Sequence, residues 1–241
     1  VVAENADLGV AFDGDGDRVS FVDGTGAVLT AEQTTWVFLQ LFGKSLAGRT
    51  VVYDIKFADL VAATVRQFGG EPRVERSGHA FIRTRMIREN GLFGAEVSGH
   101  YFYGDLRGGD DGFYSAARLL WHLAASGRSL ADWRQQCPPV FLTPDLRVRV
   151  DPRETARWLA EAKRAFADRP IGEVDGLRIE FADGWALMRG SVTEPAITFR
   201  FEGRDAAALE RVAAEFCGRL GELGRKVLAK QRAAQSAPGG S

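Results

Sequence analysis

Three aspartates alternate with glycines near the start of the chain, in the stretch FDGDGDR at residues 12–18. Asp13, Asp15 and Asp17 crowd three like charges, and each close pair costs roughly a few kcal/mol at an effective dielectric of ~20. A cation is therefore expected among them. Carboxylate oxygens with no Cys or His beside them suit Mg²⁺ better than Zn²⁺. The intervening glycines predict a tight turn that aims the three carboxylates at one point.

Besides a plain solvated acidic turn, two known motifs resemble this stretch. An EF-hand loop counted from Asp13 needs Gly at its sixth position and Glu at its twelfth, but Arg18 and Gly24 stand there. Calcium binding of that kind is excluded. Haloacid dehalogenase phosphatases also end a strand in Asp-x-Asp, with Gly-Thr usually following. Asp17 takes the Thr position here, so a nucleophilic Asp13 stays a minor alternative.

Further polar residues follow predicted strands in the middle of the chain. Lys56 follows VVYD, His79 follows VERSG, and Glu96, Ser98 and His100 follow LFGA. Taken singly, the lysine and each histidine are more often ordinary surface or structural residues. In an open parallel sheet, however, ligands bind beyond the carboxyl ends of the strands. Glu96 and Ser98 are expected on one face of an extended segment, about 7 Å apart, which suits the hydroxyls of a sugar ring.

A fourth polar cluster precedes a strand near the end of the chain, in RGSVTEP at residues 189–195. Arg189, Ser191 and Thr193 alternate there. A guanidinium, two hydroxyls and the free N–H groups of a turn are groups that bind phosphate. The alternative is a polar turn between two strands.

The elements that must position these residues can be inferred from hydrophobic periodicity and turn residues. A strand is expected at 7–12, a hairpin at 19–22 with 27–29, and a helix at 32–43. Alternating strands and helices over residues 50–103 predict a doubly wound parallel-sheet α/β domain, and the helix after it begins at an aspartate cap. CPPVFLTPD is interpreted as a linker. A smaller α+β domain follows, with elements expected at 145–151, 153–167, 177–181, 185–188, 196–201 and 205–229.

Composition limits the classes of function. The 241 residues carry 31 Lys and Arg against 32 Asp and Glu, so no basic field is available for nucleic acid or anionic lipid. Two isolated cysteines form neither a disulfide framework nor a metal ligand set. No apolar run is long enough to span a membrane, and no signal peptide is visible, so we predict a cytoplasmic protein. Because the chain starts at Val1 with a strand close behind, it is interpreted as lacking an N-terminal part.

Together these motifs resemble the α-D-phosphohexomutase family, the phosphomannomutases and phosphoglucomutases. FDGDGDR resembles the family's metal loop, GAEVSGH at 94–100 its sugar-recognition loop, and RGSVTEP its phosphate loop. SGHAFIRTRM at 77–86 and RGGDDGFYSAARLL at 107–120 also match. Family members have four domains, and the first carries a phosphorylated serine whose motif is not in this chain. The resemblance implies the end of the second domain at 1–46, a sugar-binding third domain at 47–136 and a phosphate-binding fourth domain at 145–230. The composition of the C-terminus predicts a disordered tail at 231–241.

The resemblance implies an enzyme that interconverts hexose 1-phosphate and hexose 6-phosphate, of mannose or glucose, through a hexose 1,6-bisphosphate. The fragment itself is expected to be inactive without the serine. The resemblance assigns a role to each candidate residue: Asp13, Asp15 and Asp17 hold Mg²⁺, Arg18, Lys56 and His79 support catalysis, and Glu96, Ser98, His100, Arg189, Ser191 and Thr193 bind substrate. A non-catalytic phosphosugar-binding module is the alternative.

One residue departs from the family pattern. Val192 stands where the phosphate loop of the family has Gly or Asn. A β-branched residue resists positive φ, so an altered or strained loop is expected if that position is left-handed. Arg189 is then the safer phosphate ligand.

Overall fold

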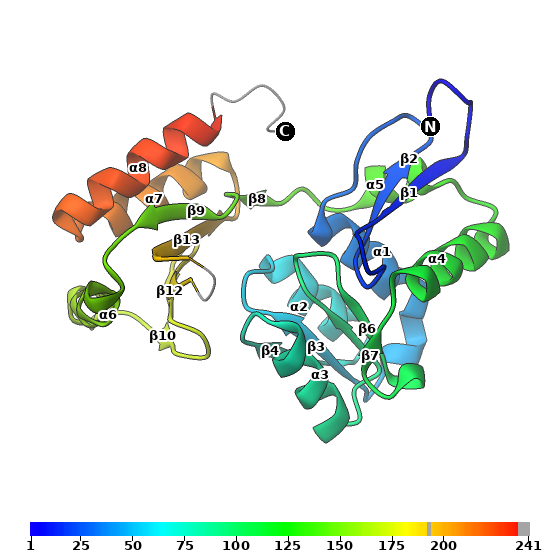
Figure 1. Cartoon of the computed structure of the whole chain (residues 1–241), viewed down its shortest axis with the longest axis horizontal. Helices are drawn as coiled ribbons and strands as arrows, with labels where there is room; N and C mark the ends of the chain where they lie inside the picture. Colours follow the sequence, from blue (N-terminus) through cyan, green and yellow to red (C-terminus); the bar gives the residue numbers. More distant parts are fainter. Residues whose placement is uncertain (192–193, 236–241) are drawn as a thin grey trace. The chain divides into compact units, whose positions relative to one another are not determined.

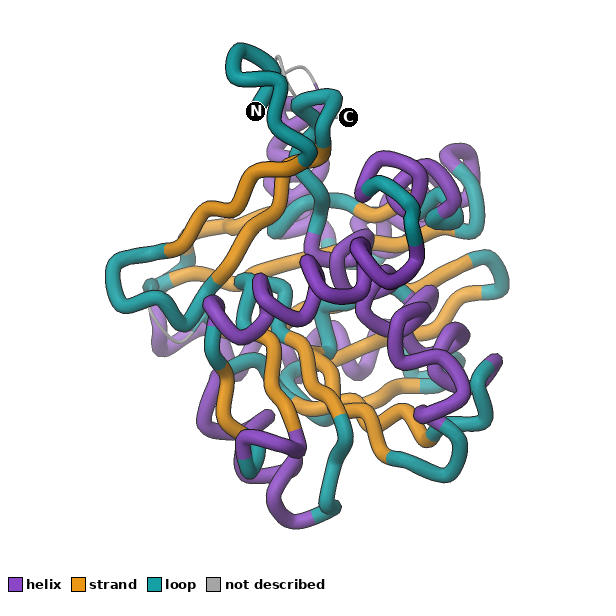
Figure 2. The backbone as a smooth tube through the Cα atoms, turned by 90° about the vertical axis from the view of Figure 1, so that its right-hand side faces the viewer, coloured by secondary structure: helices purple, strands orange, loops and turns teal. Residues whose placement is uncertain are grey.

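The chain folds into two compact units, Val1–Pro139 and Val140–Ser241, and each is described by itself. The computed structural model describes residues 1–191 and 194–235. Both units combine helices with strands (Figure 2). The boundary expected at 46/47 lies inside the first unit. Among the helices of the described residues, none is both long and apolar enough to cross a bilayer.

The first unit begins with a β-hairpin whose loop carries the three aspartates. β1 (Leu8–Phe12) pairs antiparallel with β2 (Val19–Asp23), and Phe12 lies opposite Val19. The expected pairing of 19–22 with 27–29 is reduced to one bridge, between Val22 and Val28. The aspartate stretch therefore connects two paired strands instead of following a single buried one.

The main sheet of the first unit has five strands in the order β4-β3-β5-β6-β7. Figure 1 labels β3, β4, β6 and β7 of this sheet. The strands, in chain order, are β3 (Thr50–Asp54), β4 (Glu71–Glu75), β5 (Phe93–Ala95), β6 (Tyr101–Tyr103) and β7 (Gly109–Asp110). β3, β4 and β5 are parallel, as predicted. β6 and β7, which were not predicted, add antiparallel to that sheet. Short turns can make these connections because antiparallel neighbours need no crossover.

Helices cover both faces of this sheet. Apolar side chains of α1 (Ala31–Phe42), α2 (Asp59–Gln67) and α4 (Gly112–Ser126) share one buried cluster with the sheet residues Phe93 and Tyr101. Ile82 and Met86 of α3 (His79–Arg88) pack instead with Val52 and Phe102. These four residues form a separate buried cluster, because side chains alternate between the two faces of a strand. Two 3₁₀ turns complete the unit, η1 (Gly43–Leu46) and η2 (Gly104–Leu106).

One helix of the first unit was not predicted. α5 (Leu130–Gln136) begins at Ser129, which forms a capping box with Asp132. Arg134 of this helix pairs with the fully buried Asp23 at the end of β2. The capping box is the sequence signal that was available for this helix. Its consequence is that the aspartate hairpin is fixed to the body of the unit.

The second unit is an antiparallel sheet packed against helices. Its strands are β8 (Phe141–Leu142), β9 (Leu146–Arg149), β10 (Ile171–Gly172), β11 (Leu177–Phe181), β12 (Gly184–Gly190) and β13 (Ala196–Gly203). They run in the order β10-β11-β12-β13-β8, and β9 also pairs with β13. Its helices are α6 (Pro152–Ala165), α7 (Ala206–Gly218) and α8 (Gly221–Gln235). Apolar side chains of all three helices form one buried cluster with side chains of the sheet. This packing confirms an α+β unit.

Three predictions about the second unit were wrong in detail. The helix expected at 205–229 is two helices, and Gly221 begins the second with φ of +51°. The disordered tail expected from residue 231 is helical as far as Gln235, while 236–241 lie outside the described residues. Part of the expected linker joins the sheet as β8 (Phe141–Leu142), opposite Gly203 and Glu202.

Candidate active site

The hairpin loop brings its three aspartates together. One carboxylate oxygen from each of Asp13, Asp15 and Asp17 lies within 4.8 Å of the others. Asp13 Oδ1 accepts hydrogen bonds from the backbone N–H groups of Gly16 and Arg18, both at 3.2 Å. Burial acts to raise the pKa of Asp13, but those backbone bonds and the Arg18 charge hold it below its ordinary value. The loop therefore keeps an anion at this position.

Only one of the two predicted glycines is required by the loop. Gly16 has φ of +78°, and a Cβ there would lie 2.9 Å from the ring of Phe113. Gly14 has open space around its missing Cβ and no left-handed φ. Phe113 in turn stacks on Phe12 with ring centroids 4.1 Å apart. The turn therefore depends on Gly16 and is supported by two aromatic rings.

The loop residues fit a divalent cation. Arg18 Nε lies 2.8 Å from Asp13 Oδ2 and 3.9 Å from Asp17 Oδ1, so a positive charge already stands among the carboxylates. Asp17 Oδ1 is buried and accepts no hydrogen bond from the described residues. A buried carboxylate oxygen without a donor is costly unless a cation satisfies it. The three oxygens together are the hard ligands that Mg²⁺ prefers.

The aspartate loop is fastened to the turn that follows β5. The N–H of Val19 donates to the carbonyl of Gly99 at 3.1 Å, and Arg18 and His100 form an antiparallel bridge. Gly99 has φ of +96°, and a Cβ there would meet the Val19 carbonyl at 3.0 Å. The close approach of the two segments therefore requires glycine at that position.

Glu96 and Ser98 lie in a tight turn between β5 and β6, not on an extended segment as expected. The Glu96 N–H donates to the His100 carbonyl at 2.9 Å, and the Gly99 N–H donates to the Glu96 carbonyl at 3.0 Å. Glu96 is 9% exposed. Burial, and then the charge of Asp54, raise its pKa despite the nearby His100 and Lys56. The nearby Ser98 hydroxyl also acts to lower the pKa of Glu96.

Lys56, at the end of β3, pairs with Asp54, a residue that was not predicted to belong to the site. Asp54 is fully buried, and its Oδ2 lies 3.7 Å from Lys56 Nζ. Its Oδ1 accepts from the Ser77 hydroxyl at 2.6 Å and from the Lys56 N–H at 3.0 Å. Ser77 follows β4, so two parallel strands meet here at their carboxyl ends. The Lys56 side chain is only 11% exposed, so it is not an ordinary surface lysine.

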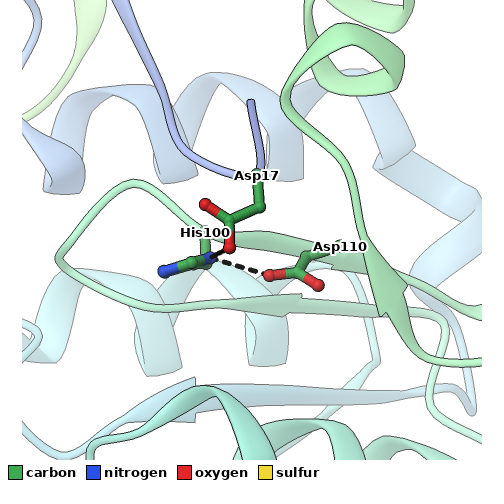
Figure 3. Close-up of side chains that lie close together, drawn as sticks. All are labelled: Asp17, His100 and Asp110. Carbon is green, nitrogen blue, oxygen red and sulfur yellow. Dashed lines mark hydrogen bonds and ion pairs between the residues drawn. The ribbon is translucent and has the colours of Figure 1, made fainter. Parts of the chain in front are cut away.

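Both predicted histidines bind one carboxylate, that of Asp110 in β7. His100 Nδ1 lies 2.7 Å from Asp110 Oδ2, and His79 Nε2 lies 2.9 Å from Asp110 Oδ1. Asp17 Oδ2 lies 3.8 Å from the same His100 nitrogen (Figure 3). Burial alone would lower the pKa of His100, but the Asp110 hydrogen bond and the charges of Glu96 and Asp17 raise it. Burial acts to raise the pKa of Asp110, but the hydrogen bonds and charges of His100 and His79 lower it below its ordinary value.

In the second unit, the structure pairs the predicted phosphate ligand with a carboxylate. Arg189 lies in β12 and is 7% exposed. Its Nε lies 2.8 Å from Asp175 Oδ2, and the two side chains form an ion pair. The Ser191 hydroxyl accepts from the Glu194 N–H at 3.3 Å. Thr193 and Val192 lie outside the described residues.

The first unit thus joins the predicted residues into one set of contacts at the carboxyl ends of β3, β4 and β5. The set runs from Asp13, Asp15, Asp17 and Arg18 through His100 and Glu96 to Ser98, Lys56 and His79. Sequence reasoning missed three residues of this set, Asp54, Ser77 and Asp110. The stretch GGDDG was interpreted only as a helix cap. Asp111 does cap α4, accepting from the Tyr114 N–H at 2.8 Å, while its neighbour Asp110 faces the histidines.

Two family models match the chain. The model described as phosphoglucomutase/phosphomannomutase, alpha/beta/alpha domain III, matches residues 30–141. The model described as phosphoglucomutase/phosphomannomutase, C-terminal domain, matches residues 146–219. The two matches cover most of the chain, in the order that the sequence motifs implied.

Known proteins agree with these models. A phosphomannomutase/phosphoglucomutase of Pseudomonas aeruginosa is 34% identical over 227 residues, which are 91% of this chain and 48% of that protein. A phosphoglucomutase/phosphomannomutase family protein from Burkholderia thailandensis superposes with a TM-score of 0.82 at 31% identity, covering 93% and 49% of the two chains. The chain spans about half the length of the relatives it matches.

A more distant structure shares the fold. An N-acetylphosphoglucosamine mutase from Aspergillus fumigatus, solved in complex with GlcNAc-6P and magnesium, gives a TM-score of 0.62 at 14% identity. The similarity covers 87% of this chain and 51% of that one.

Proposed function

The chain belongs to the phosphoglucomutase/phosphomannomutase family, and on that premise we propose that it supplies the metal-binding and sugar-binding part of a phosphohexomutase. The whole protein would interconvert the 1-phosphate and the 6-phosphate of mannose or glucose through a hexose 1,6-bisphosphate. One observation carries the proposal. The aspartate loop, fastened to the Glu96–His100 turn by the Val19–Gly99 hydrogen bond, lies beside two histidines that share one carboxylate.

Asp13, Asp15 and Asp17 would hold Mg²⁺ in this proposal. The metal supplies positive charge that offsets the repulsion between a phosphoryl group and an incoming hydroxyl oxygen. Arg18 adds a second positive charge at the same place, from a guanidinium that already contacts Asp13. The Aspergillus fumigatus mutase, which shares the fold, was solved with both GlcNAc-6P and magnesium, and this supports a site for a sugar phosphate and Mg²⁺.

Glu96 and Ser98 would bind the sugar hydroxyls. A buried carboxylate is a strong acceptor for hydroxyl donors, and the Ser98 hydroxyl both donates and accepts. Because the two residues lie in one tight turn, they would present a joint site instead of two positions on an extended strand. His100 and Lys56, which face the same carboxylate, would line the sugar site and donate to its oxygens.

The phosphatase alternative is disfavoured by the geometry of Asp13. An aspartate nucleophile needs one oxygen free to approach phosphorus. Asp13 Oδ1 accepts two backbone hydrogen bonds, and Oδ2 lies 2.8 Å from Arg18 Nε. Both oxygens are engaged within the loop, so neither is free to approach phosphorus in this arrangement.

Arg189 would contact the distal phosphate through the guanidinium edge that does not face Asp175. Its pairing with Asp175 holds the side chain in one orientation, which lowers the entropy lost on binding. The roles of Ser191 and Thr193 as phosphate ligands, the domain division at 46/47 and the cytoplasmic location also remain predictions.

An assay of the full-length protein that carries this chain tests the proposal. With Mg²⁺ and a trace of glucose 1,6-bisphosphate, ³¹P NMR should show mannose 1-phosphate or glucose 1-phosphate converted to the 6-phosphate. Glu96→Gln should lower kcat/KM roughly 10- to 100-fold, since it weakens charge-assisted hydrogen bonds to the sugar. Glu4→Gln, at an exposed position, is the matched control.

Absence of interconversion with both sugars would contradict the mutase proposal and favour a phosphosugar-binding module. The chain alone should bind phosphosugars without turnover, so isomerisation by the pure chain would contradict the need for a phosphoserine outside it.

A further inference from the structure

A second group of metal-ligating atoms lies next to the aspartate loop. One atom each from Asp17, His100 and Asp110 lies within 4.8 Å of the others (Figure 3). We propose that these three residues form a separate site for a divalent metal that prefers imidazole, such as Zn²⁺, sharing Asp17 with the Mg²⁺ loop. The proposal concerns this chain's own side chains and goes beyond the proposed mutase function.

The ligand types separate this site from the loop. The loop offers carboxylate oxygens alone, which suit Mg²⁺, whereas the second group adds an imidazole nitrogen, which suits Zn²⁺ and the later transition metals. One nitrogen and two carboxylate oxygens make a three-ligand set, and Zn²⁺ in such sets keeps a fourth position for water or another small ligand.

The distances require little movement. Zn²⁺ binds nitrogen and oxygen ligands at about 2.1 Å, so the ligand atoms of a tetrahedral site lie about 3.4 Å apart. His100 Nδ1 lies 2.7 Å from Asp110 Oδ2 and 3.8 Å from Asp17 Oδ2. These two separations lie on either side of the tetrahedral value. Small side-chain rotations would therefore bring the three atoms around one ion.

The backbone holds the three ligands in place although they come from different segments. The Val19–Gly99 hydrogen bond fastens the aspartate loop to the His100 turn. The Gly112 N–H donates to the Gly16 carbonyl at 3.0 Å, which fastens the same loop to the start of α4, next to Asp110. A site held by hydrogen bonds between segments loses little conformational entropy when the metal binds.

Burial and the surrounding contacts favour metal binding at the same point. The side chains of His100 and Asp110 are 10% and 7% exposed, and that of Asp17 is 36% exposed, so an ion would enter from the Asp17 side. His79 Nε2 lies 2.9 Å from Asp110 Oδ1, the oxygen that does not face His100, and so helps to orient the carboxylate. Partners of this kind around metal ligands typically change metal affinity 10- to 100-fold when removed.

Because Asp17 belongs to both sites, Zn²⁺ bound at the second site should affect the Mg²⁺ loop. A metal bound to His100 Nδ1 displaces the proton that this nitrogen shares with Asp110 into solvent, and it binds Asp17 Oδ2, which draws negative charge of Asp17 away from the Mg²⁺ loop. Zn²⁺ bound here should therefore inhibit the Mg²⁺-dependent reaction, a consequence that rests on the proposed function, whereas the site itself does not.

Calorimetric titration of the chain with Zn²⁺, in saturating Mg²⁺ and without any sugar phosphate, tests the site. The wild-type chain should bind one Zn²⁺ ion. His100→Gln and Asp110→Asn should each lower the Zn²⁺ affinity by at least about tenfold. Asp15→Asn, which removes a ligand of the loop alone, should leave it within about threefold of wild type. His122→Gln removes another histidine of the chain, in α4, and serves as the control.

The same titration can overturn the proposal. Unchanged Zn²⁺ affinity in His100→Gln would place the ion elsewhere, and loss of zinc binding in Asp15→Asn would place it in the aspartate loop. Far-ultraviolet circular dichroism identifies any variant that fails to fold, and ¹⁵N shifts of the imidazoles in the wild-type chain then decide the question. Zn²⁺ should shift His100 Nδ1 and leave His122 unchanged. Because no sugar is present, failure of the mutase proposal would not alter these results.

Discussion

His100 Nδ1 and Asp110 Oδ2 lie 2.7 Å apart, ten residues apart in sequence, with both side chains almost fully enclosed. The second oxygen of the same carboxylate receives His79, so one aspartate positions both histidines of the site. In the proposed mutase site, Asp110 acts through these two histidines and is not itself assigned to the sugar. It is therefore a positioning residue.

Asp110→Asn should lower the pKa of His100, because the hydrogen bond and the negative charge that raise it are lost. A histidine whose pKa is raised on folding stabilises the fold below its unfolded value of about 6.5, and this stabilisation is lost as the pH rises through the folded value. The stability deficit of the variant should thus shrink from acidic to alkaline pH. NMR titration of the imidazoles and urea unfolding across that range measure both effects.

Asp105→Asn is the control for that experiment, since the Asp105 side chain is 67% exposed and pairs with Tyr114 and Arg118 of α4. An unchanged His100 pKa in Asp110→Asn would show that the short contact does not determine the state of the histidine.

Asp15→Asn should weaken Mg²⁺ binding on the order of tenfold or more while leaving the fold intact. Asp15 is exposed and supplies one of three anionic ligands, and the loop around it is restrained by Gly16. Calorimetry with Mg²⁺ measures the effect, and Asp7→Asn, at another exposed position before β1, is the control. Equal affinities of the Asp15 and Asp7 variants would remove Asp15 from the metal site.

Glu96→Gln should gain stability relative to the wild type as the pH rises. The pKa of Glu96 is raised on folding, so its ionisation is unfavourable in the folded chain, and the wild type loses stability above the ordinary glutamate value. The amide carries no such dependence. Urea unfolding between about pH 4 and pH 7.5 measures the difference, with Glu4→Gln as the control. A variant that is strongly destabilised at neutral pH would indicate a structural role for Glu96 instead of a binding role.

Much of the first unit follows from its sequence because the signals are local. The apolar run before Asp13, the alternating strands and helices from residue 50, and the cap at Asp111 each act within a few residues. The Glu96–Ser98 turn was mistaken for a strand because a short alternating segment has the same period whether or not it bends. Asp110 could not be found in this way. Its role depends on β7 pairing with β6, a contact that no local pattern specifies.

The second unit shows the same limit. The helical pattern continues through Gly221, so two helices were predicted as one, although a positive φ there changes the direction of the chain. Arg189 was identified from its motif, but its partner Asp175 lies fourteen residues earlier in the turn before β11. An isolated carboxylate carries no signal in the sequence that it will meet an arginine in the fold.

Arg189→Ala should destabilise the second unit by about 3 kcal/mol, because it removes one partner of a largely buried ion pair. Arg204→Ala, which breaks a pair with Asp183 where the arginine side chain is 66% exposed, should cost less than about 1 kcal/mol. Thermal and urea unfolding compare the two. Equal, small effects would show that Arg189 is free for ligands and not structurally committed to Asp175.

The central claim, that the aspartate loop and the Glu96–His100 turn together bind a hexose phosphate, is tested most directly by NMR. Isotope-labelled chain is titrated with glucose 1,6-bisphosphate in the presence and absence of Mg²⁺. The account predicts that the amide signals of residues 13–18 and 96–100 shift together, that Mg²⁺ strengthens the effect, and that Glu96→Gln weakens it. Shifts confined to other parts of the chain, or none at millimolar ligand with Mg²⁺ present, would contradict it.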